Sequence, residues 1–270
     1  DSSVKMQMIS DRPLGVFLSG GIDSSSILYF ASKHSQSRVK TFSVGFDIPG
    51  EGEKFNADFN LARKTAEFFN ADHHELFVSG KDVLENIEEA AYHMDEPISN
   101  HTQVVTMLLS KYAAKEVTVV LGGDGGDEIF GGYDRYRKSK IISAFQKLPA
   151  PVRKILSPLS EKLEMRGARR YLSFMAQKEE NLKTAIKPGL LNYEKVENFF
   201  NERYFSGGNK DYENNFMLTD FKTWLADESL MRTDKMSMAH GLEERVPFLD
   251  RELIELGYSI PSKYKVCFFK

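Results

Sequence analysis

The stretch VFLSGGIDSSS, Val16–Ser26, changes character abruptly. An apolar run ends at Leu18, two glycines and an aspartate follow among four serines, and apolar residues resume at Ile27. Such a stretch can be an ordinary tight turn between a strand and a helix. It can also bind phosphate, because glycines let backbone N–H groups approach an anion and the N-terminus of a following helix carries partial positive charge.

Strands and helices alternate around this stretch. Apolar runs bounded by turn residues predict buried strands at 13–18, 39–46, 72–79 and 117–121. Helical spacing of apolar residues predicts helices at 24–34, 56–70, 81–94 and 102–115. Ser24 or Asp23 is expected as the N-cap of the first helix. This alternation predicts the α/β class, with a parallel sheet covered by helices on both faces.

The remainder of the chain has a different pattern. From about 140 to 225 it shows helical spacing, proline breaks and no strand signal, and 221–257 is again helical, interrupted by RVPFLD at 245–250. We therefore expect three parts: an α/β core over 1–140, a helical segment over 141–220 and a second helical segment over 221–270. The start at Asp1 and the apolar end without a stop signal favour a piece of a longer protein, truncated at its C-terminus.

Composition limits the function classes. The net charge of −3, from 36 basic and 39 acidic residues, predicts no general nucleic-acid binding. The single cysteine, Cys267, excludes an intrachain disulfide and fits a reducing, cytoplasmic location. No apolar run approaches the roughly 18 residues of a membrane span, so no membrane association is expected. The polar start also lacks the hydrophobic segment of a signal peptide.

A second glycine-rich stretch, GGDGGDE, follows the predicted strand at 117–121. Ligands of open parallel sheets bind at the carboxyl ends of the strands, where both loops are expected. Neither loop has the dinucleotide-binding glycine spacing or the lysine of a Walker A loop. Their carboxylates, Asp23, Asp124 and Asp127, would repel a bare phosphate, and a bridging Mg²⁺ ion removes that conflict. The alternative is a pair of glycine-rich turns with capping aspartates.

Several stretches resemble a known family. SGGIDSS, at 19–25, resembles the pyrophosphate loop of the ATP-pyrophosphatase superfamily. Together with TFSVGF, DEPI (95–98), VLGGDGGDEIFGGY (120–133) and DKMSMAHGLEERVPFLD (234–250), it makes nearly the whole chain similar to the synthetase domain of the asparagine synthetase family. The resemblance implies an adenine nucleotide alpha hydrolase-like fold and ATP binding by the core over 1–140.

The resemblance also implies a reaction. A substrate carboxylate, from aspartate or a related acid, attacks the α-phosphorus of ATP in the presence of Mg²⁺ and gives an acyl-adenylate and pyrophosphate. Ammonia then displaces AMP and leaves an amide. In the family an N-terminal glutaminase domain with a cysteine as its first residue supplies the ammonia. That domain is missing from this chain, Cys267 cannot replace it, and a homodimer is left open.

Site residues follow from the resemblance. It assigns pyrophosphate binding to Ser19, Gly20, Gly21, Ser24 and Ser25. It assigns the rest of the nucleotide contacts to Leu18, Val44, Gly122 and Gly123. Asp23 and Asp127 are expected to hold Mg²⁺, and Asp124 to be catalytic. Arg245 is expected either to bind the acceptor carboxylate or to form a structural ion pair.

Two departures from the family pattern bear on the substrate. Asparagine-forming enzymes usually carry SGEGSDE where this chain has GGDGGDE, so Asp124 replaces a glutamate and is one methylene shorter. An acceptor of another shape than aspartate is therefore favoured. The lysine that neutralises the adenylating phosphate cannot be matched to Lys263, Lys265 or Lys270. The alternatives are a related ATP-pyrophosphatase acting on a polysaccharide-linked carboxylate or on tRNA, and an inactive scaffold.

Overall fold

The computed structural model describes all residues except 49–54, 97–99, 157, 159–160, 178, 188, 191, 208–210 and 268–270. Pro97 and Ile98 of the DEPI stretch, and Lys270, therefore lie outside the described residues. The chain forms two compact units, one from 1–126 with 223–254 and one from 127–222 with 255–270. These bounds differ from the three parts expected from the sequence, and that three-part division stays a prediction.

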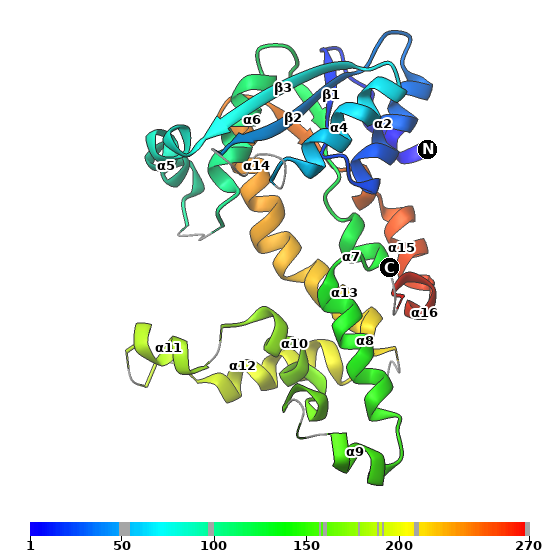
Figure 1. The fold of residues 1–270 in the computed structure, drawn as a ribbon, viewed down its shortest axis with the longest axis vertical. Helices are drawn as coiled ribbons and strands as arrows, with labels where there is room; N and C mark the ends of the chain where they lie inside the picture. Colours follow the sequence, from blue (N-terminus) through cyan, green and yellow to red (C-terminus); the bar gives the residue numbers. More distant parts are fainter. Residues whose placement is uncertain are drawn as a thin grey trace. The chain divides into compact units, whose positions relative to one another are not determined.

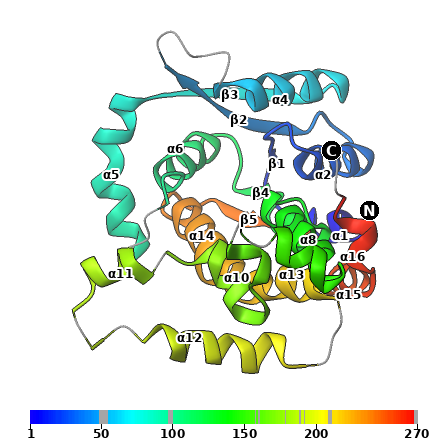
Figure 2. The ribbon, with the colours of Figure 1, turned by 60° about the horizontal axis from the view of Figure 1, so that its bottom comes forward.

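The first unit contains a five-stranded sheet in the order β3-β2-β1-β4-β5, with every neighbouring pair parallel (Figures 1 and 2). The strands are β1 (Leu14–Phe17), β2 (Lys40–Asp47), β3 (Asp72–Ser79), β4 (Val119–Leu121) and β5 (Glu243–Arg245). The first four coincide closely with the predicted strands. The parallel α/β class is confirmed.

Strand β5 was missed, because 221–257 was expected to be helical. Its residues are Glu-Glu-Arg, so it has no apolar alternation to mark it. It forms by pairing with β4: Glu243 N–H donates to the Thr118 carbonyl at 3.0 Å, and Gly122 N–H donates to the Arg245 carbonyl at 2.8 Å. A charged, three-residue strand at a sheet edge is typical of natural edges, and only the tertiary pairing identifies it.

Helices cover both faces of this sheet. On one face α1 (Ser2–Gln7), α2 (Ile22–His34) and α4 (Ala57–Phe68) share a core with Val16, Leu18 and Leu121. On the other face the buried side chains of α6 (Gln103–Ala113) pack with Phe42 and Val120, while α5 (Gly80–Met94), α6 and α14 (Met231–Met238) share a second cluster. Figure 2 shows α4 and α6 on opposite sides of β2. The predicted two-sided covering is thus confirmed.

The described part of the second unit is helical. Its long helices are α8 (Asp134–Gln146), α10 (Gly167–Met175), α12 (Tyr193–Phe200) and α13 (Tyr212–Lys222). Shorter elements are α9 (Ala150–Leu156), η2 (Glu161–Glu164), α11 (Glu179–Ala185), η3 (Asn201–Phe205) and α16 (Ser262–Lys265). Tyr136, Tyr171, Leu172, Phe216 and Met217 form its core. Helices α7 (Gly126–Phe130) and α15 (Arg251–Ser259) span the boundaries between the units, while η4 (Leu225–Leu230) and η5 (Pro247–Leu249) belong to the first.

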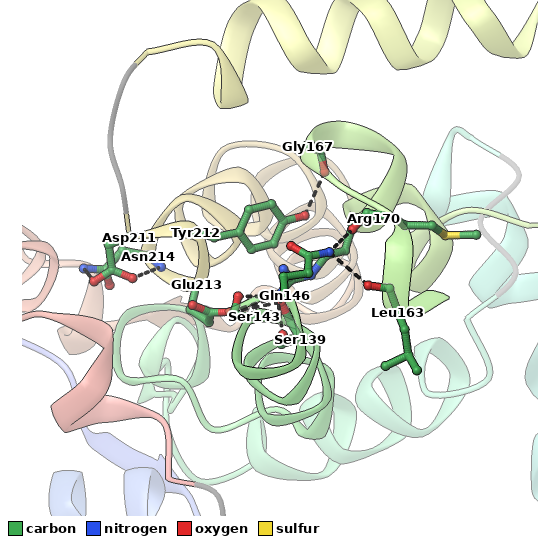
Figure 3. A network of polar contacts seen from close by, with 11 residues as sticks. Ser139, Ser143, Gln146, Leu163, Gly167, Arg170, Asp211, Tyr212, Glu213 and Asn214 are labelled. Atoms are coloured by element: carbon green, nitrogen blue, oxygen red, sulfur yellow. Dashed lines mark hydrogen bonds and ion pairs between the residues drawn. The ribbon is translucent and has the colours of Figure 1, made fainter. Parts of the chain in front are cut away.

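A buried ion pair lies within the second unit (Figure 3). Arg170 on α10 is 1% exposed, and its Nη2 lies 2.9 Å from Oε1 of Glu213 on α13. Ser143 of α8 donates to the same carboxylate oxygen at 2.6 Å. The guanidinium carbon of Arg170 lies 3.9 Å from the centroid of the Tyr212 ring. These contacts join α8, α10 and α13 through one charge pair.

None of the helices in the described ranges combines the length and the apolar character required to cross a membrane.

Candidate functional site

The two glycine-rich loops meet at the carboxyl ends of two neighbouring strands, β1 and β4. The chain runs from β1 outward through β2 to β3, and then continues with β4 on the other side of β1. Loops that leave adjacent strands at such a reversal line the usual ligand site of an open parallel sheet. A Cβ placed on Gly123 would lie 3.4 Å from the Ser24 backbone nitrogen and 3.5 Å from Asp23 Cβ, in van der Waals contact. The loops after β1 and β4 therefore line one site.

The first loop is shaped by Gly20. Its φ of +79° lies in the left-handed region, and a Cβ there would lie 2.6 Å from both the Asp58 carbonyl oxygen and the Ala62 nitrogen of α4. Gly21 is the N-cap, so α2 begins at Ile22. The expected cap at Ser24 or Asp23 is wrong, since both residues already lie within the first turn. Glycine leads the chain into the helix here, and no side-chain cap is needed.

The serines of this loop have two kinds of environment. Ser24 is buried, and its Oγ accepts from Ser19 N–H at 3.2 Å, lies 3.1 Å from Ser19 Oγ and donates to the Gly21 carbonyl at 3.3 Å. Ser25 is half-buried, and its N–H donates to the Gly21 carbonyl. Ser19 and Gly21 are exposed. Ser24 therefore holds the loop together, while Ser19 and Gly21 form its accessible surface.

The beginning of α2 has the electrostatics of an anion site. The helix has 13 residues, and no side chain caps its N-terminal N–H groups. Such groups and the helix macrodipole favour a negatively charged ligand. Asp23 in the first turn places a half-buried carboxyl group beside these donors. A Cβ at Gly126 would lie 2.6 Å from Asp23 Cγ, so glycine there provides the space that the carboxyl group occupies.

The other expected nucleotide residues occupy different positions. Leu18 is buried at 2% exposure, and Val44 on β2 is half-buried and paired with Leu76 of β3. Gly122 is buried and Gly123 is half-buried. Asp127 belongs to the second unit, so its role as a Mg²⁺ ligand stays a prediction. Within the described ranges, no group of three or more His, Cys, Asp or Glu side chains could hold a metal ion.

Asp124 lies in a polar network within the first unit. Its Oδ1 accepts a hydrogen bond from Ser229 Oγ at 3.2 Å. Arg232 donates to the same Ser229 oxygen at 3.3 Å and to Glu228 Oε1 at 3.2 Å. Burial is the largest influence on the pKa of Asp124 and raises it, while the positive charge of Arg232 acts to lower it.

Glu244 on β5 is a site residue that the sequence analysis missed. Its side chain is hydrogen-bonded to Asp124, and its Oε2 is buried without a hydrogen-bond partner among the described residues. Burial, and after it the negative charge of Asp124, raise the pKa of Glu244 well above its usual value. Strand alternation within EER would have placed Glu244 on the opposite face from its neighbours, but only once β5 was known.

Arg245 has the contacts of a structural residue. Its Nε donates to Glu243 Oε1 at 2.7 Å, and its Nη1 donates to the Gln7 and Ile9 carbonyls at 2.7 and 2.8 Å. It thus links β5 to the end of α1 and the residues that follow. These contacts favour the ion-pair alternative, and acceptor binding by Arg245 stays a prediction without support from them.

Lys265 is held within the second unit. It donates to the Ile129 and Gly257 carbonyls at 3.0 and 2.9 Å. Burial lowers its pKa to about 8. Lys263 is exposed. These contacts give Lys265 a structural role and do not identify the lysine that would act on a phosphate.

Comparison with known proteins identifies close relatives along the whole chain. The chain is 32% identical over 280 residues to asparagine synthetase [glutamine-hydrolyzing] 1 of Bacillus subtilis, covering 97% of this chain and 43% of that protein. It is also 32% identical to a putative asparagine synthetase [glutamine-hydrolyzing] of Mycobacterium bovis, covering 98% of this chain and 42% of that protein. The chain thus spans about two fifths of the length of these relatives.

Two further matches cover a smaller part of this chain. Asparagine synthetase B of Escherichia coli is 31% identical over 173 residues, which cover 58% of this chain and 30% of that protein. The solved structure of the NH3-dependent NAD synthetase from Campylobacter jejuni in complex with the nitrate ion aligns with a TM-score of 0.35 and 17% identity. That alignment covers 77% of this chain and 92% of the synthetase, a likeness too weak to support a conclusion.

The sequence model of the asparagine synthase family matches residues 1–268. That match, the relatives that cover nearly all of this chain and the two loops at the edge of a parallel sheet agree with one another. The chain belongs to the asparagine synthase family.

Proposed function

We propose that this chain is the synthetase part of an amide-forming ligase that uses ATP, a carboxylic acid and ammonia. One observation carries the proposal: the N-terminus of α2, without a side-chain cap, opens beside Asp23 where the β1 and β4 loops meet. The named relatives are glutamine-hydrolysing asparagine synthetases, which supports the same reaction class. A glutaminase domain of the longer protein would deliver the ammonia.

The first loop would bind the phosphates of ATP. Ser19 and Gly21 are its exposed residues, and the first-turn N–H groups of α2 add donors along the helix axis. Gly20, Ser24 and Ser25 would keep the loop in shape and contribute the remaining pyrophosphate contacts. Residues with buried or half-buried side chains or backbone would frame the adenosine: Leu18, Val44, Gly122 and Gly123.

Mg²⁺ fits the residues present here in one specific way. The described residues offer no three-membered ligand set, but Mg²⁺ is commonly held by one or two carboxylates together with phosphate oxygens and water. Asp23 and Asp127 would supply the carboxylates. When bound, the ion would neutralise the negative charge of the phosphates. Without the ion, the Asp23 carboxylate would repel a phosphate bound at the N-terminus of α2.

The reaction would occur in two steps. In the first, a carboxylate oxygen of the acceptor bonds to the α-phosphorus of ATP, the bond from this phosphorus to the bridging oxygen breaks, and pyrophosphate leaves with the electron pair. In the second, the ammonia nitrogen bonds to the acyl carbon and AMP leaves with its oxygen. Asp124 would accept the proton lost from nitrogen, as a general base within hydrogen-bond reach. The acceptor is aspartate or an acid of another shape, as the shorter Asp124 favours.

Release of pyrophosphate tests this function. The longer protein that contains this chain would be given Mg-ATP, ammonium and a panel of carboxylic acids that includes aspartate and acidic sugars. We expect pyrophosphate release with one class of acid, and amide formation only when ammonium is also present. Pyrophosphate release with tRNA, but with none of the acids, would favour the tRNA alternative. No release with any acceptor would favour the inactive scaffold.

Binding of the nucleotide is tested separately on this chain. Mg-ATP should raise its Tm, because a ligand that binds the folded state stabilises it by mass action. Asp23→Ala should abolish the Mg²⁺-dependent part of that shift. Asp72→Ala, at the amino end of β3, is the matched control and should keep the full shift. An unchanged shift in Asp23→Ala would reject Asp23 as a metal ligand.

A further inference from the structure

Glu244 lies across the backbone of the second glycine-rich loop. In the parallel register of β4 with β5 it is paired with Val120. A Cβ on Gly122 would lie only 1.9 Å from Glu244 Oε1 and 2.9 Å from its Cδ. The carboxyl group therefore occupies the space that glycine leaves open at 122. Asp124, two residues after Gly122 in the same loop, is hydrogen-bonded to the Glu244 carboxyl group.

A hydrogen bond between two carboxyl groups requires a proton. Ionised carboxylate oxygens only accept, so one of the two groups must carry the hydrogen. Two carboxylates that share a buried site cannot both ionise freely, and one proton is retained. Asp124 is the residue expected to act as the base, which makes the position of this proton relevant to the chemistry.

The surrounding charges favour the same arrangement. Arg232 of α14 is the cation that acts on both Asp124 and Glu244, and it is also bonded to Glu228 of η4. Asp234 of α14 adds a further negative charge near Glu244. Asp23, in the first turn of α2, lies next to Gly123. Because these carboxylates outnumber the one arginine, retaining a proton on the pair reduces the repulsion.

The two members of the pair are not equivalent. Asp124 accepts from Ser229 and feels the charge of Arg232, both of which stabilise its ionised form. Glu244 has a buried Oε2 without a hydrogen-bond partner among the described residues, so its ionised form would be poorly solvated. Burial raises the pKa of both groups. The proton therefore belongs on Glu244, which donates to an ionised Asp124.

We propose that Glu244 is a positioning residue: it shares one proton with Asp124 and holds that carboxylate, ionised and correctly oriented, as the acceptor of a proton from ammonia. This role rests on the function proposed above. On amide formation the nitrogen loses one proton to Asp124, and the pair then holds two protons. One of them leaves to solvent before the next turnover. Glu244 touches neither ammonia nor the acyl-adenylate in this arrangement.

The kinetic test uses the longer protein and the acid that supports pyrophosphate release. Glu244→Ala should lower kcat for ammonia-dependent amide formation by roughly 10-fold and leave the KM for ATP unchanged. This effect is smaller than the roughly 10²-fold expected for a direct general base, because Glu244 acts only through Asp124. Glu244→Gln should restore most of that loss, because its amide N–H replaces the donated hydrogen bond. In the parent protein, kcat should fall at high pH as Glu244 ionises. Glu244→Gln should remove this fall, because the amide does not ionise.

Glu243→Gln is the matched control, because it removes an exposed carboxyl group from the same strand. It should leave the pH profile unchanged. A Glu244→Gln profile identical to that of the parent protein, or full activity of Glu244→Ala, would overturn the proposal.

A stability test of this chain separates the proton pair from the reaction. A carboxyl group whose pKa is higher in the folded state than in the unfolded state has no effect at low pH, where both states hold the proton. It destabilises the folded state increasingly as the pH rises above the unfolded value near 4.3. Glu244→Gln lacks this group, so its Tm should equal that of the parent chain near pH 4 and exceed it by roughly 5 °C at pH 8.

Glu243→Gln should show no such growing difference, since its carboxyl group is exposed. Equal pH dependence of the two variants would overturn the shared proton, and so would a Glu244→Gln chain that fails to fold at pH 8, because the amide has nearly the shape of the protonated acid. If the stability result appears but no acid supports pyrophosphate release, the proposed function fails while the carboxyl pair stands.

Discussion

Each of the two units contains an acidic side chain that is at least half-buried, and the two acids have opposite kinds of partner. In the second unit Glu213 faces the guanidinium of Arg170 and also accepts from Ser143. In the first unit Asp124 faces another acid, Glu244, with Arg232 reached through Ser229. A buried carboxylate with a cation and hydroxyl donors joins helices, whereas two acids together destabilise the fold. Such pairs are expected at functional sites, where chemistry requires a shifted pKa.

Removing one partner of the Glu213–Arg170 pair should give the largest effect. Glu213→Ala leaves a buried, uncompensated guanidinium, so we expect a loss of about 3–5 kcal/mol in the free energy of unfolding. Urea unfolding of the variant measures it. The double variant Arg170→Met with Glu213→Leu should recover much of that loss, because it removes both charges together. If Glu213→Ala is as stable as the parent chain, the Glu213–Arg170 ion pair does not stabilise the fold.

Asp124→Asn addresses the other half of the comparison. We expect amide formation to fall by on the order of 10²-fold, a typical general-base contribution, while ATP affinity is retained. Turnover with ammonium and the Kd for ATP are measured on the longer protein. The same variant should not lower the free energy of unfolding, because the amide removes a buried charge. Near-normal turnover would leave Asp124 as a loop residue and would weaken the distinction between the two regions.

Gly122→Ala tests the space that Glu244 occupies. The added methyl group would overlap the Glu244 carboxyl group, so we expect a loss of about 1–3 kcal/mol in the free energy of unfolding, as for overpacking elsewhere. Gly80→Ala is the control, because a Cβ there has no heavy atom within 4 Å. Combining Gly122→Ala with Glu244→Ala should restore stability. If Gly122→Ala behaves like Gly80→Ala, the carboxyl group does not lie over this glycine.

Much of the first unit could be predicted because its signals are local. The strands through Val16, Phe42 and Val120 are apolar, and each is bounded by turn residues. The glycine-rich loops could be expected at one edge of the sheet, since parallel strands place their carboxyl ends together. The role of Gly20 could be expected only in part: its need for a special backbone conformation is a local property, but its close approach to α4 is not.

What could not be predicted depends on contacts between distant segments. β5 is a strand only because it pairs with β4, and Glu244 reaches Asp124 only as a consequence of that pairing. The sequence EERV by itself suggested either acceptor binding or an ion pair for Arg245, and no role for Glu244. The start of α2 at Ile22 was also missed, because Gly21 does not have the usual side chain of a cap.

The pairing of β4 with β5 also has a consequence for synthesis on the ribosome. Roughly 120 residues separate these two neighbouring strands, and the whole intervening part of the second unit emerges before β5 does. At typical translation rates this takes on the order of 10 s. During that time β4, with its sequence Val-Val-Leu, is an open apolar edge that can pair with another chain. This edge of the nascent protein therefore stays exposed to aggregation until β5 is made, and a chaperone that covers it would act in that interval.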